Sequence, residues 1–352
     1  MFIYFNICLI FFLFPKRVQP LPGSMLPLVW DFGQLNEDAE RIYILQMLKR
    51  LKKQGFEEIE NDLEKISEVL TESQKFMRNQ KDECSFVSLR DIERVIKVAL
   101  WFLDKKDILI NRMLTRKIKN RNDSYQEHLS VIKKAFIFSL SVCYHSALSC
   151  KYTRFAYRRL LGNCLKIPNF KFTQQNDWVI CEILKCQHIF LDEVELKNNI
   201  ARNSALLENV LMMIICVELR IPLFIVGKPG SSKSLAKTIV SNAMQGNNSK
   251  SDLFRNLKEA YFVNFQCSPL TTPEMIVETF REAAQFQEGN SLEKSVAVVN
   301  LDEIGLAEAS ESMPLKALHP LLEEGTDSAE MALPHQKVGM IGISNWSLGK
   351  IF

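Results

Sequence analysis

The sequence predicts an α/β fold: a parallel sheet with flanking helices in the C-terminal part, preceded by an all-helical region. Continuous apolar runs predict three of the strands, because parallel strands covered on both faces carry few polar residues. These runs lie at 222–226, 296–301 and 337–343, and amphipathic stretches separate them. Each run is followed by glycine, acidic or amide residues, so polar groups are expected at one edge of the sheet.

A turn rich in glycine and serine follows the first strand and opens a helix. It reads Gly227, Lys228, Pro229, Gly230, Ser231, Ser232, Lys233 and Ser234, and apolar residues then recur at helical spacing, at Leu235, Ala236, Ile239, Val240 and Ala243. Unpaired N–H groups at a helix start favour phosphate oxygens. The pattern predicts a triphosphate-binding loop from Gly227 to Leu235, with Lys233 on the β and γ phosphates and the Ser234 hydroxyl on Mg²⁺. Read alone, these residues also fit an ordinary turn.

Ser232 is the one departure from the phosphate-loop pattern G-x-x-x-x-G-K-[ST], because it stands where the last glycine belongs. If the loop needs a left-handed backbone there, serine costs roughly 1–2 kcal/mol. We expect that cost to weaken the affinity for nucleotide.

Two adjacent carboxylates follow the strand at 296–301. Asp302 is placed to hold the Mg²⁺ shell, directly or through water, and Glu303 to orient and deprotonate an attacking water. A solvated acidic strand end is the alternative, but the phosphate loop earlier in the chain favours the catalytic interpretation. Asn300 lies inside this strand, where a buried amide needs partners, and the sequence does not explain it.

Asn345 is the third polar group expected at this edge. It follows the strand at 337–343, where its side-chain amide could contact the γ-phosphate or the attacking water, although a turn residue is the commoner role for a lone asparagine. Residues 261–267 predict a further strand, and within it Asn264 is a weak candidate for contacting Glu303.

Helices complete the alternating pattern. Thr272 and Pro273 provide an N-cap and a first-turn proline for a helix through about Phe286. Further helices are expected at 196–219, before the first strand, and at 314–322.

The stretch from Pro222 to Trp346 resembles an AAA+ module of the mysterin family, giant ring-finger E3 ubiquitin ligases with a dynein-like AAA+ core. The segments GKPGSSKSLAKTIV, LDEIGLAE, LHPLLEEG and GISNW carry the resemblance, and the first reproduces the serine at position 232. The resemblance implies a P-loop NTPase fold, ATP and Mg²⁺ as ligands, and a cytoplasmic protein. It also implies adjacent AAA+ modules of the same polypeptide as partners, and the ubiquitin machinery through parts outside this chain.

Two stretches nearer the N-terminus, at 26–35 and 82–102, resemble the end of a preceding AAA+ module. In AAA+ proteins a helical lid follows the α/β subdomain, and a Ser-x-Arg at the start of a lid helix supplies an arginine to the nucleotide. Ser88 and Arg90 fit that pattern, so the resemblance implies that Arg90 is the sensor of the neighbouring module. From the pattern alone, this is an amphipathic helix capped by Ser88 or Asp91, with Arg90 as a surface charge.

We therefore expect four parts: an apolar segment at 1–17 that is foreign to the fold, a lid-like helical region at 18–120, a helical linker at 121–194 and an α/β nucleotide-binding subdomain at 195–352. The apolar segment is too short to span a bilayer and lacks the basic start of a secretory signal. The lid and arginine finger of the second module are expected beyond Phe352. Because an arginine finger contributes roughly 10³ to 10⁵ in rate, we expect weak binding and negligible hydrolysis.

The amino-acid composition limits the classes of partner and ligand expected for this chain. Of 352 residues, 47% are hydrophobic and 24% charged, which is typical of soluble globular structure. The net charge of +3 is too small to argue for nucleic acid or a membrane surface, and no transmembrane segment is expected. Nine cysteines include no paired C-x-x-C elements, which argues against a zinc ring and for buried, reduced thiols.

Three functions remain open. The chain can belong to an ATP-hydrolysing AAA+ module of a ligase, to a nucleotide-responsive scaffold (a pseudo-ATPase), or to an AAA+ motor of midasin or dynein type without ligase function. The complete carboxylate pair favours the first.

Overall fold

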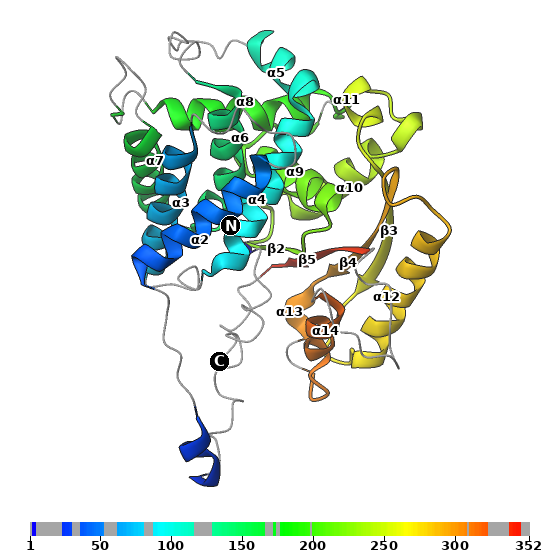
Figure 1. Ribbon diagram of the computed structural model, residues 1–352. Coiled ribbons are helices and arrows are strands. Elements are labelled where there is room, and N and C mark those ends of the chain that lie inside the picture. Colours follow the sequence, from blue (N-terminus) through cyan, green and yellow to red (C-terminus); the bar gives the residue numbers. More distant parts are fainter. Residues whose placement is uncertain are drawn as a thin grey trace.

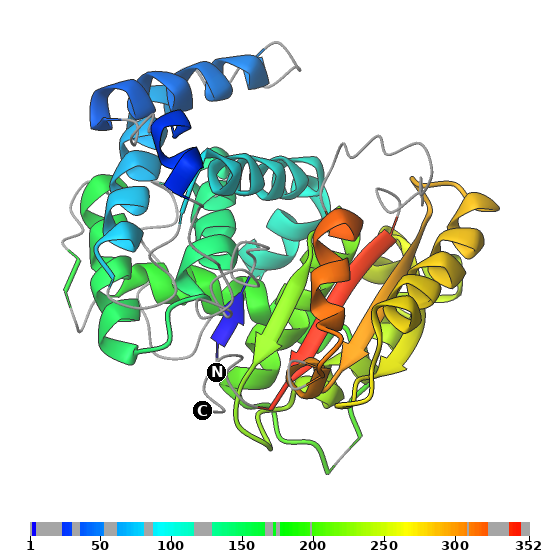
Figure 2. The same ribbon diagram turned by 90° about the horizontal axis from the view of Figure 1, so that it is seen from below.

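The computed structural model describes residues 2–4, 23–29, 36–52, 62–80, 87–115, 129–165, 172–173, 177–197, 199–307, 310–322 and 338–345. A bundle of helices from the N-terminal half lies beside a sheet with helices on both faces (Figures 1 and 2). The predicted α/β fold class with a preceding helical region is confirmed.

The bundle contains seven α-helices within the described residues: α2 (Glu37–Lys52), α3 (Leu63–Arg78), α4 (Leu89–Asp104), α5 (Lys106–Thr115), α6 (Val131–Leu140), α7 (Lys151–Leu165) and α8 (Trp178–Asp192). A 3₁₀ turn, η2 (Gly23–Leu28), precedes them, and a π-helical turn, η6 (Ser141–His145), extends α6. Because α3 packs on α7 and α4 on α6, helices on both sides of the predicted boundary at residue 120 form one packed unit. None of the described helices has the length and apolarity needed to cross a bilayer.

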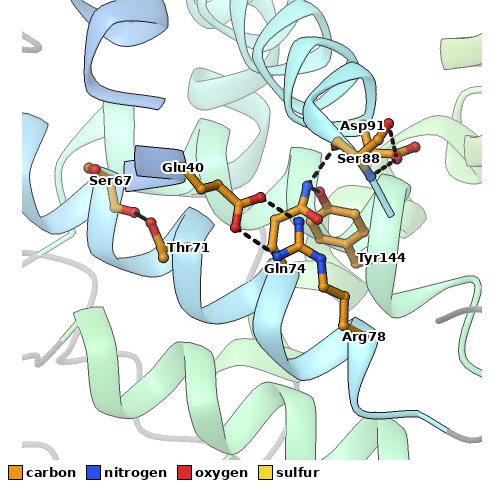
Figure 3. Close-up of polar contacts among 8 residues, drawn as sticks. All are labelled: Glu40, Ser67, Thr71, Gln74, Arg78, Ser88, Asp91 and Tyr144. Carbon is orange, nitrogen blue, oxygen red and sulfur yellow. Dashed lines mark hydrogen bonds and ion pairs between the residues drawn. The ribbon is translucent and has the colours of Figure 1, made fainter. Parts of the chain in front are cut away.

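Buried polar side chains join the helices of the bundle (Figure 3). Gln74 of α3 donates hydrogen bonds of 2.9 Å to the Tyr144 hydroxyl and of 2.9 Å to the carbonyl oxygen of Ser88. Arg78 of α3 pairs with Glu40 of α2 through both carboxylate oxygens, one at 2.7 Å. Such paired geometry offsets part of the cost of removing the Glu40 charge from water, and it links α2 to α3.

The sheet has the strand order β1-β2-β5-β4-β3, and every pair except β1–β2 is parallel. The strands are β1 (Phe2–Tyr4), β2 (Leu223–Val226), β3 (Glu259–Gln266), β4 (Ser295–Asp302) and β5 (Val338–Ser344). Of the apolar segment at 1–17, the structure describes only β1, which pairs antiparallel with β2 at the edge of the sheet. The proposal that this segment is foreign to the fold stays a prediction.

Helices cover both faces of the sheet (Figure 1). One face carries α9 (Ser204–Leu219) and α10 (Lys233–Ala243), and the other carries α12 (Pro273–Glu288), α13 (Ile304–Ala307) and α14 (Leu318–Leu322). Short elements lie between them, namely η7 (Gly246–Asn248), α11 (Asp252–Arg255) and η8 (Pro314–Ala317). Because α9 packs on β2 and β5 and also on α4 and α8, this helix forms the interface between the sheet and the helical bundle.

Two helix predictions need correction. The helix expected at 196–219 begins only at Ser204, because the Asn203 side chain caps it by accepting the N–H of Leu206 at 2.8 Å. The helix expected at 314–322 begins as the 3₁₀ turn η8, whose first position is Pro314.

Most described cysteines are buried, as predicted, and all are free thiols: Cys143, Cys181, Cys186, Cys216 and Cys267 are buried, Cys164 is half-buried and Cys150 is exposed. Burial raises the pKa of the Cys267 thiol to about 12, so this thiol stays protonated at neutral pH.

Candidate nucleotide-binding site

The carboxyl ends of β2, β5 and β4 bring the predicted site residues of the C-terminal part to one edge of the sheet. The loop at 227–232 follows β2, Asp302 ends β4 with Glu303 behind it, and Asn345 follows β5. The N–H of Gly227 donates to the carbonyl oxygen of Ser344 at 3.2 Å, which ties the start of the loop to β5. Open α/β sheets bind ligands at this edge.

The backbone of the loop is left-handed at two positions. Gly230 has φ +81°, and a Cβ added there would meet nothing within 4 Å. Ser232 has φ +60° and ψ +22°, so the serine that replaces the last glycine of the pattern does adopt the left-handed conformation. The expected cost of roughly 1–2 kcal/mol therefore applies to it.

Lys233 begins α10 and turns its ammonium back into the loop. Its Nζ donates to the carbonyl oxygens of Gly227 at 2.7 Å and Lys228 at 3.0 Å, and to the Ser231 hydroxyl at 3.2 Å. Burial lowers the pKa of Lys233, and the negative charge of Glu303 opposes that shift. An ammonium held inside a loop by three oxygen atoms suits a group that exchanges them for phosphate oxygens.

Asp302 lies in a polar network that sequence reasoning missed. Lys237 of α10 places its Nζ 2.9 Å from Asp302 Oδ2, and the buried amide of Asn300 donates to the same oxygen at 3.0 Å. The Asn300 amide also donates to Asn264 Oδ1 at 3.1 Å, so its Nδ2 has two acceptors, while its Oδ1 has no hydrogen-bond partner among the described residues. Lys237 lies one turn after Lys233 on α10, and that spacing is the signal that could have found it.

Glu303 is held by Asn345 and not by Asn264. The Asn345 amide donates to Glu303 Oε1, whereas Asn264 faces Asn300 and Lys237, so the predicted contact between Asn264 and Glu303 is wrong. The cause is register: Asn264 lies opposite Asn300 on β4, two residues before Asp302. Glu303 has φ +53°, a conformation that directs its side chain away from the ordinary path of the strand.

Oxygen ligands for Mg²⁺ fit this edge only in part. Ser234 is exposed in the first turn of α10, and Asp302 offers a carboxylate. Across the described residues, no group of three or more His, Cys, Asp and Glu side chains could hold a metal ion. Mg²⁺ usually takes one or two protein ligands and shares the rest with phosphates and water, and the Ser234 hydroxyl and the Asp302 carboxylate are oxygen donors of that kind.

Arg90 lies in the bundle, exposed on the first turn of α4. Ser88 or Asp91 was expected to cap this helix, and the two together form a capping box, in which the N–H of Ser88 donates to Asp91 at 2.7 Å (Figure 3). The predicted amphipathic helix is therefore present with its cap, and the sensor role of Arg90 stays a proposal.

Similar proteins agree with this fold. Residues 199–350 match a family model described as the RNF213 AAA domain. The chain is 49% identical over 335 residues to E3 ubiquitin-protein ligase RNF213 of Homo sapiens, a match that covers 94% of this chain and 6% of the relative. It is 46% identical over 332 residues to RNF213 of Mus musculus and 46% over 333 residues to rnf213-beta of Danio rerio, with the same shares covered. The chain thus spans about 6% of the length of these curated relatives and belongs to the RNF213, or mysterin, family, as a segment that includes its AAA domain.

Proposed function

We propose that residues 195–352 are an ATP-binding and ATP-hydrolysing AAA+ module of a mysterin-like E3 ubiquitin-protein ligase. The observation that carries the proposal is the contact between Asn345 and Glu303 at the sheet edge where the phosphate loop begins. An amide that holds a carboxylate beside a phosphate loop suits hydrolysis, because the attacking water needs an oriented base.

The loop would bind the phosphates of ATP. The first N–H groups of α10 have no acceptor within the helix, and Lys233 adds a positive charge beside them. On binding, Lys233 would exchange the carbonyl oxygens of Gly227 and Lys228 for β and γ phosphate oxygens. Ser234 and Asp302 would hold Mg²⁺, which when bound neutralises charge on the phosphates.

Glu303 would act as the general base. Its carboxylate takes a proton from water as the water oxygen bonds to the γ-phosphorus, and the bond from that phosphorus to the bridging oxygen breaks, with ADP and phosphate as products. Asn345 keeps the carboxylate in place through Oε1 and leaves Oε2 for the water. In this proposal Glu303 and Asn345 are the catalytic residues.

The partners of this module are inferred from the relatives that the chain resembles. The relatives carry the name E3 ubiquitin-protein ligase, so we infer that this module works beside other AAA+ modules of one cytoplasmic polypeptide whose further parts engage the ubiquitin machinery. Arg90 would serve the nucleotide of the preceding module. The net charge of +3 gives no reason to add nucleic acid to these partners.

A pseudo-ATPase scaffold is the second candidate, and Lys237 favours it. Its ammonium already neutralises Asp302, at 2.9 Å, and a carboxylate so paired is a poorer ligand for Mg²⁺. In that case ATP binding would order the module without turnover.

Labelled ATP separates these candidates. We expect the 352-residue chain to bind ATP weakly and Lys233→Ala to abolish that binding. In a longer segment of the protein that includes the lid, Glu303→Gln should keep binding and lose the turnover of its unsubstituted parent. Equal residual turnover with and without Glu303→Gln would favour the scaffold. Binding that survives Lys233→Ala would overturn the nucleotide site itself.

A further inference from the structure

Two asparagines, Asn203 at the N-cap of α9 and Asn209 within α9, reach the strained part of the phosphate loop. Asn203 Nδ2 donates to the Ser232 hydroxyl at 3.3 Å, and Asn209 Nδ2 donates to the carbonyl oxygen of Ser231 at 3.0 Å. The two contacts flank one peptide bond, between Ser231 and Ser232. They meet the loop at the position where the phosphate-loop pattern has glycine and this chain has a left-handed serine.

Asn209 is an unusual residue for its place. It is fully buried in α9, among the apolar side chains that pack on the sheet, and its Oδ1 has no hydrogen-bond partner among the described residues. A buried, half-satisfied amide destabilises a fold relative to an apolar residue of the same shape. Its remaining contact, with the Ser231 carbonyl, therefore points to a role in the loop.

The geometry of the peptide bond says what that role is. A trans peptide is planar, and its C=O and N–H point in opposite directions. Because the C=O of Ser231 turns toward Asn209 on α9, the N–H of Ser232 turns to the opposite side of the loop. That N–H directly precedes the open amides of α10, so it extends the row of donors available to phosphate.

Asn203 acts on the serine side chain. Its Oδ1 caps α9, and its Nδ2 donates to the Ser232 hydroxyl, so one side chain joins the start of α9 to the N-cap residue of α10. A glycine at 232 would adopt the left-handed turn without strain and would offer Asn203 nothing to hold.

We propose that Asn203 and Asn209 are positioning residues that clamp the Ser231–Ser232 peptide in the left-handed turn and so present the Ser232 N–H to the phosphates of a nucleotide. The inference rests on the proposed nucleotide binding. In this proposal Ser232, Asn203 and Asn209 act together, because the two asparagines hold serine in a left-handed backbone conformation that glycine would adopt without help.

Binding of a fluorescent ATP analogue with Mg²⁺ to the 352-residue chain tests the clamp. Asn209→Leu should weaken binding by about tenfold, the effect of losing one well-placed donor, while the unfolding midpoint without nucleotide stays the same or rises because the unpartnered Oδ1 is gone. A role confined to fold stability would lower that midpoint instead. Asn242→Ser, on the exposed end of α10, is the matched control and should change neither quantity.

Asn203→Ser separates the clamp from the helix cap, because serine caps a helix as well as asparagine does but is too short to reach Ser232. It should weaken binding by about threefold in the native chain and have no effect beside Ser232→Gly, since the hydroxyl that it held is gone. Equal losses in both backgrounds, or unchanged affinity in Asn209→Leu, would overturn the clamp. If Asn209→Leu does not fold, the Asn203 and Ser232 pair decides alone. Failure of the native chain to bind the analogue would overturn the nucleotide site and the clamp together.

Discussion

The indole Nε1 of Trp101 donates a hydrogen bond of 3.2 Å to Oε2 of Glu218, and this contact joins α4 of the bundle to α9 beside the sheet. The other oxygen, Oε1, accepts the backbone N–H of Lys258, just before β3. The carbonyl oxygen of Glu218 also accepts the Lys258 ammonium at 3.0 Å. A single residue that is 5% exposed thus holds three elements together.

Truncation of this joint should loosen the sheet from the bundle. Glu218→Ala removes both carboxylate contacts and leaves the Trp101 indole and the Lys258 amide unpaired, so we expect a loss of about 3 kcal/mol in the free energy of unfolding. Glu218→Gln keeps one acceptor oxygen and should cost about 1 kcal/mol. Urea unfolding measures both losses. Equal losses in the two variants would contradict the prediction, because the side-chain oxygen that glutamine keeps would then contribute nothing to stability.

Lys237 should compete with Mg²⁺ for Asp302, because its ammonium lies 2.9 Å from the carboxylate. Lys237→Met removes the competing charge, and the Mg²⁺ concentration at half-maximal ATP binding should fall several-fold, by about as much as one screened ion pair is worth. Lys237→Arg keeps the charge and should leave that midpoint in place. A higher midpoint in Lys237→Met would show that Lys237 assists the site.

His145 should make the bundle sensitive to acid. Burial, with Arg154 and Arg158 nearby, holds the pKa of His145 well below its ordinary value of 6.5. The unfolded chain therefore takes up a proton as the pH falls below about 6.5 while the folded chain does not, so stability is lost on acidification and is fully present at higher pH. The contribution is at most about 1.4 kcal/mol per pH unit.

His145→Asn isolates this contribution. Unfolding free energies between pH 7.5 and 5 should fall less steeply in the variant than in the native chain, whatever the absolute loss from substitution. The Arg158 guanidinium, which contacts His145 at 2.9 Å and pairs with Asp177, is present in both proteins and cancels in the comparison. Parallel pH profiles would contradict the prediction.

Two glycines of β5 should respond oppositely to alanine. A Cβ at Gly342 would lie 2.8 Å from the Phe224 ring, so Gly342→Ala should destabilise the sheet by about 1–3 kcal/mol. A Cβ at Gly339 would meet its nearest atom, on Val298, at an ordinary 3.5 Å, so Gly339→Ala should be neutral or slightly stabilising. Thermal unfolding of the pair tests whether β2 and β5 pack as described.

The sequence was sufficient to predict those parts of the candidate site that lie directly after a strand in the chain. Apolar runs located β2, β4 and β5, and the residues after each run identified the loop, Asp302, Glu303 and Asn345. The pattern also singled out Ser232 as the position where a left-handed backbone would be costly, and the structure has that backbone there.

What the sequence could not supply depends on contacts between elements. Asn264 lies opposite Asn300 only because β3 and β4 pair in one register, and a different register would have brought another residue to Glu303. Asn209 reads as an odd polar residue in an apolar helix until α9 is seen against the loop. The start of α9 was missed because apolar residues at helical spacing continue upstream of Asn203. Only the geometry of the Asn203 cap sets the first residue of the helix.

The position of β5 between β2 and β4 determines the order in which the strands of the sheet can pair as the chain is synthesised. Both neighbours precede β5 in the sequence, and they can join only when it inserts between them. Until then β2 and β4 each present an unpaired edge, the kind of surface that recruits chaperones or aggregates. A nascent chain that has released β4 but not β5 would therefore hold a divided sheet, with β2 separate from β4 and β3, and the Gly227–Ser344 contact could form only afterwards.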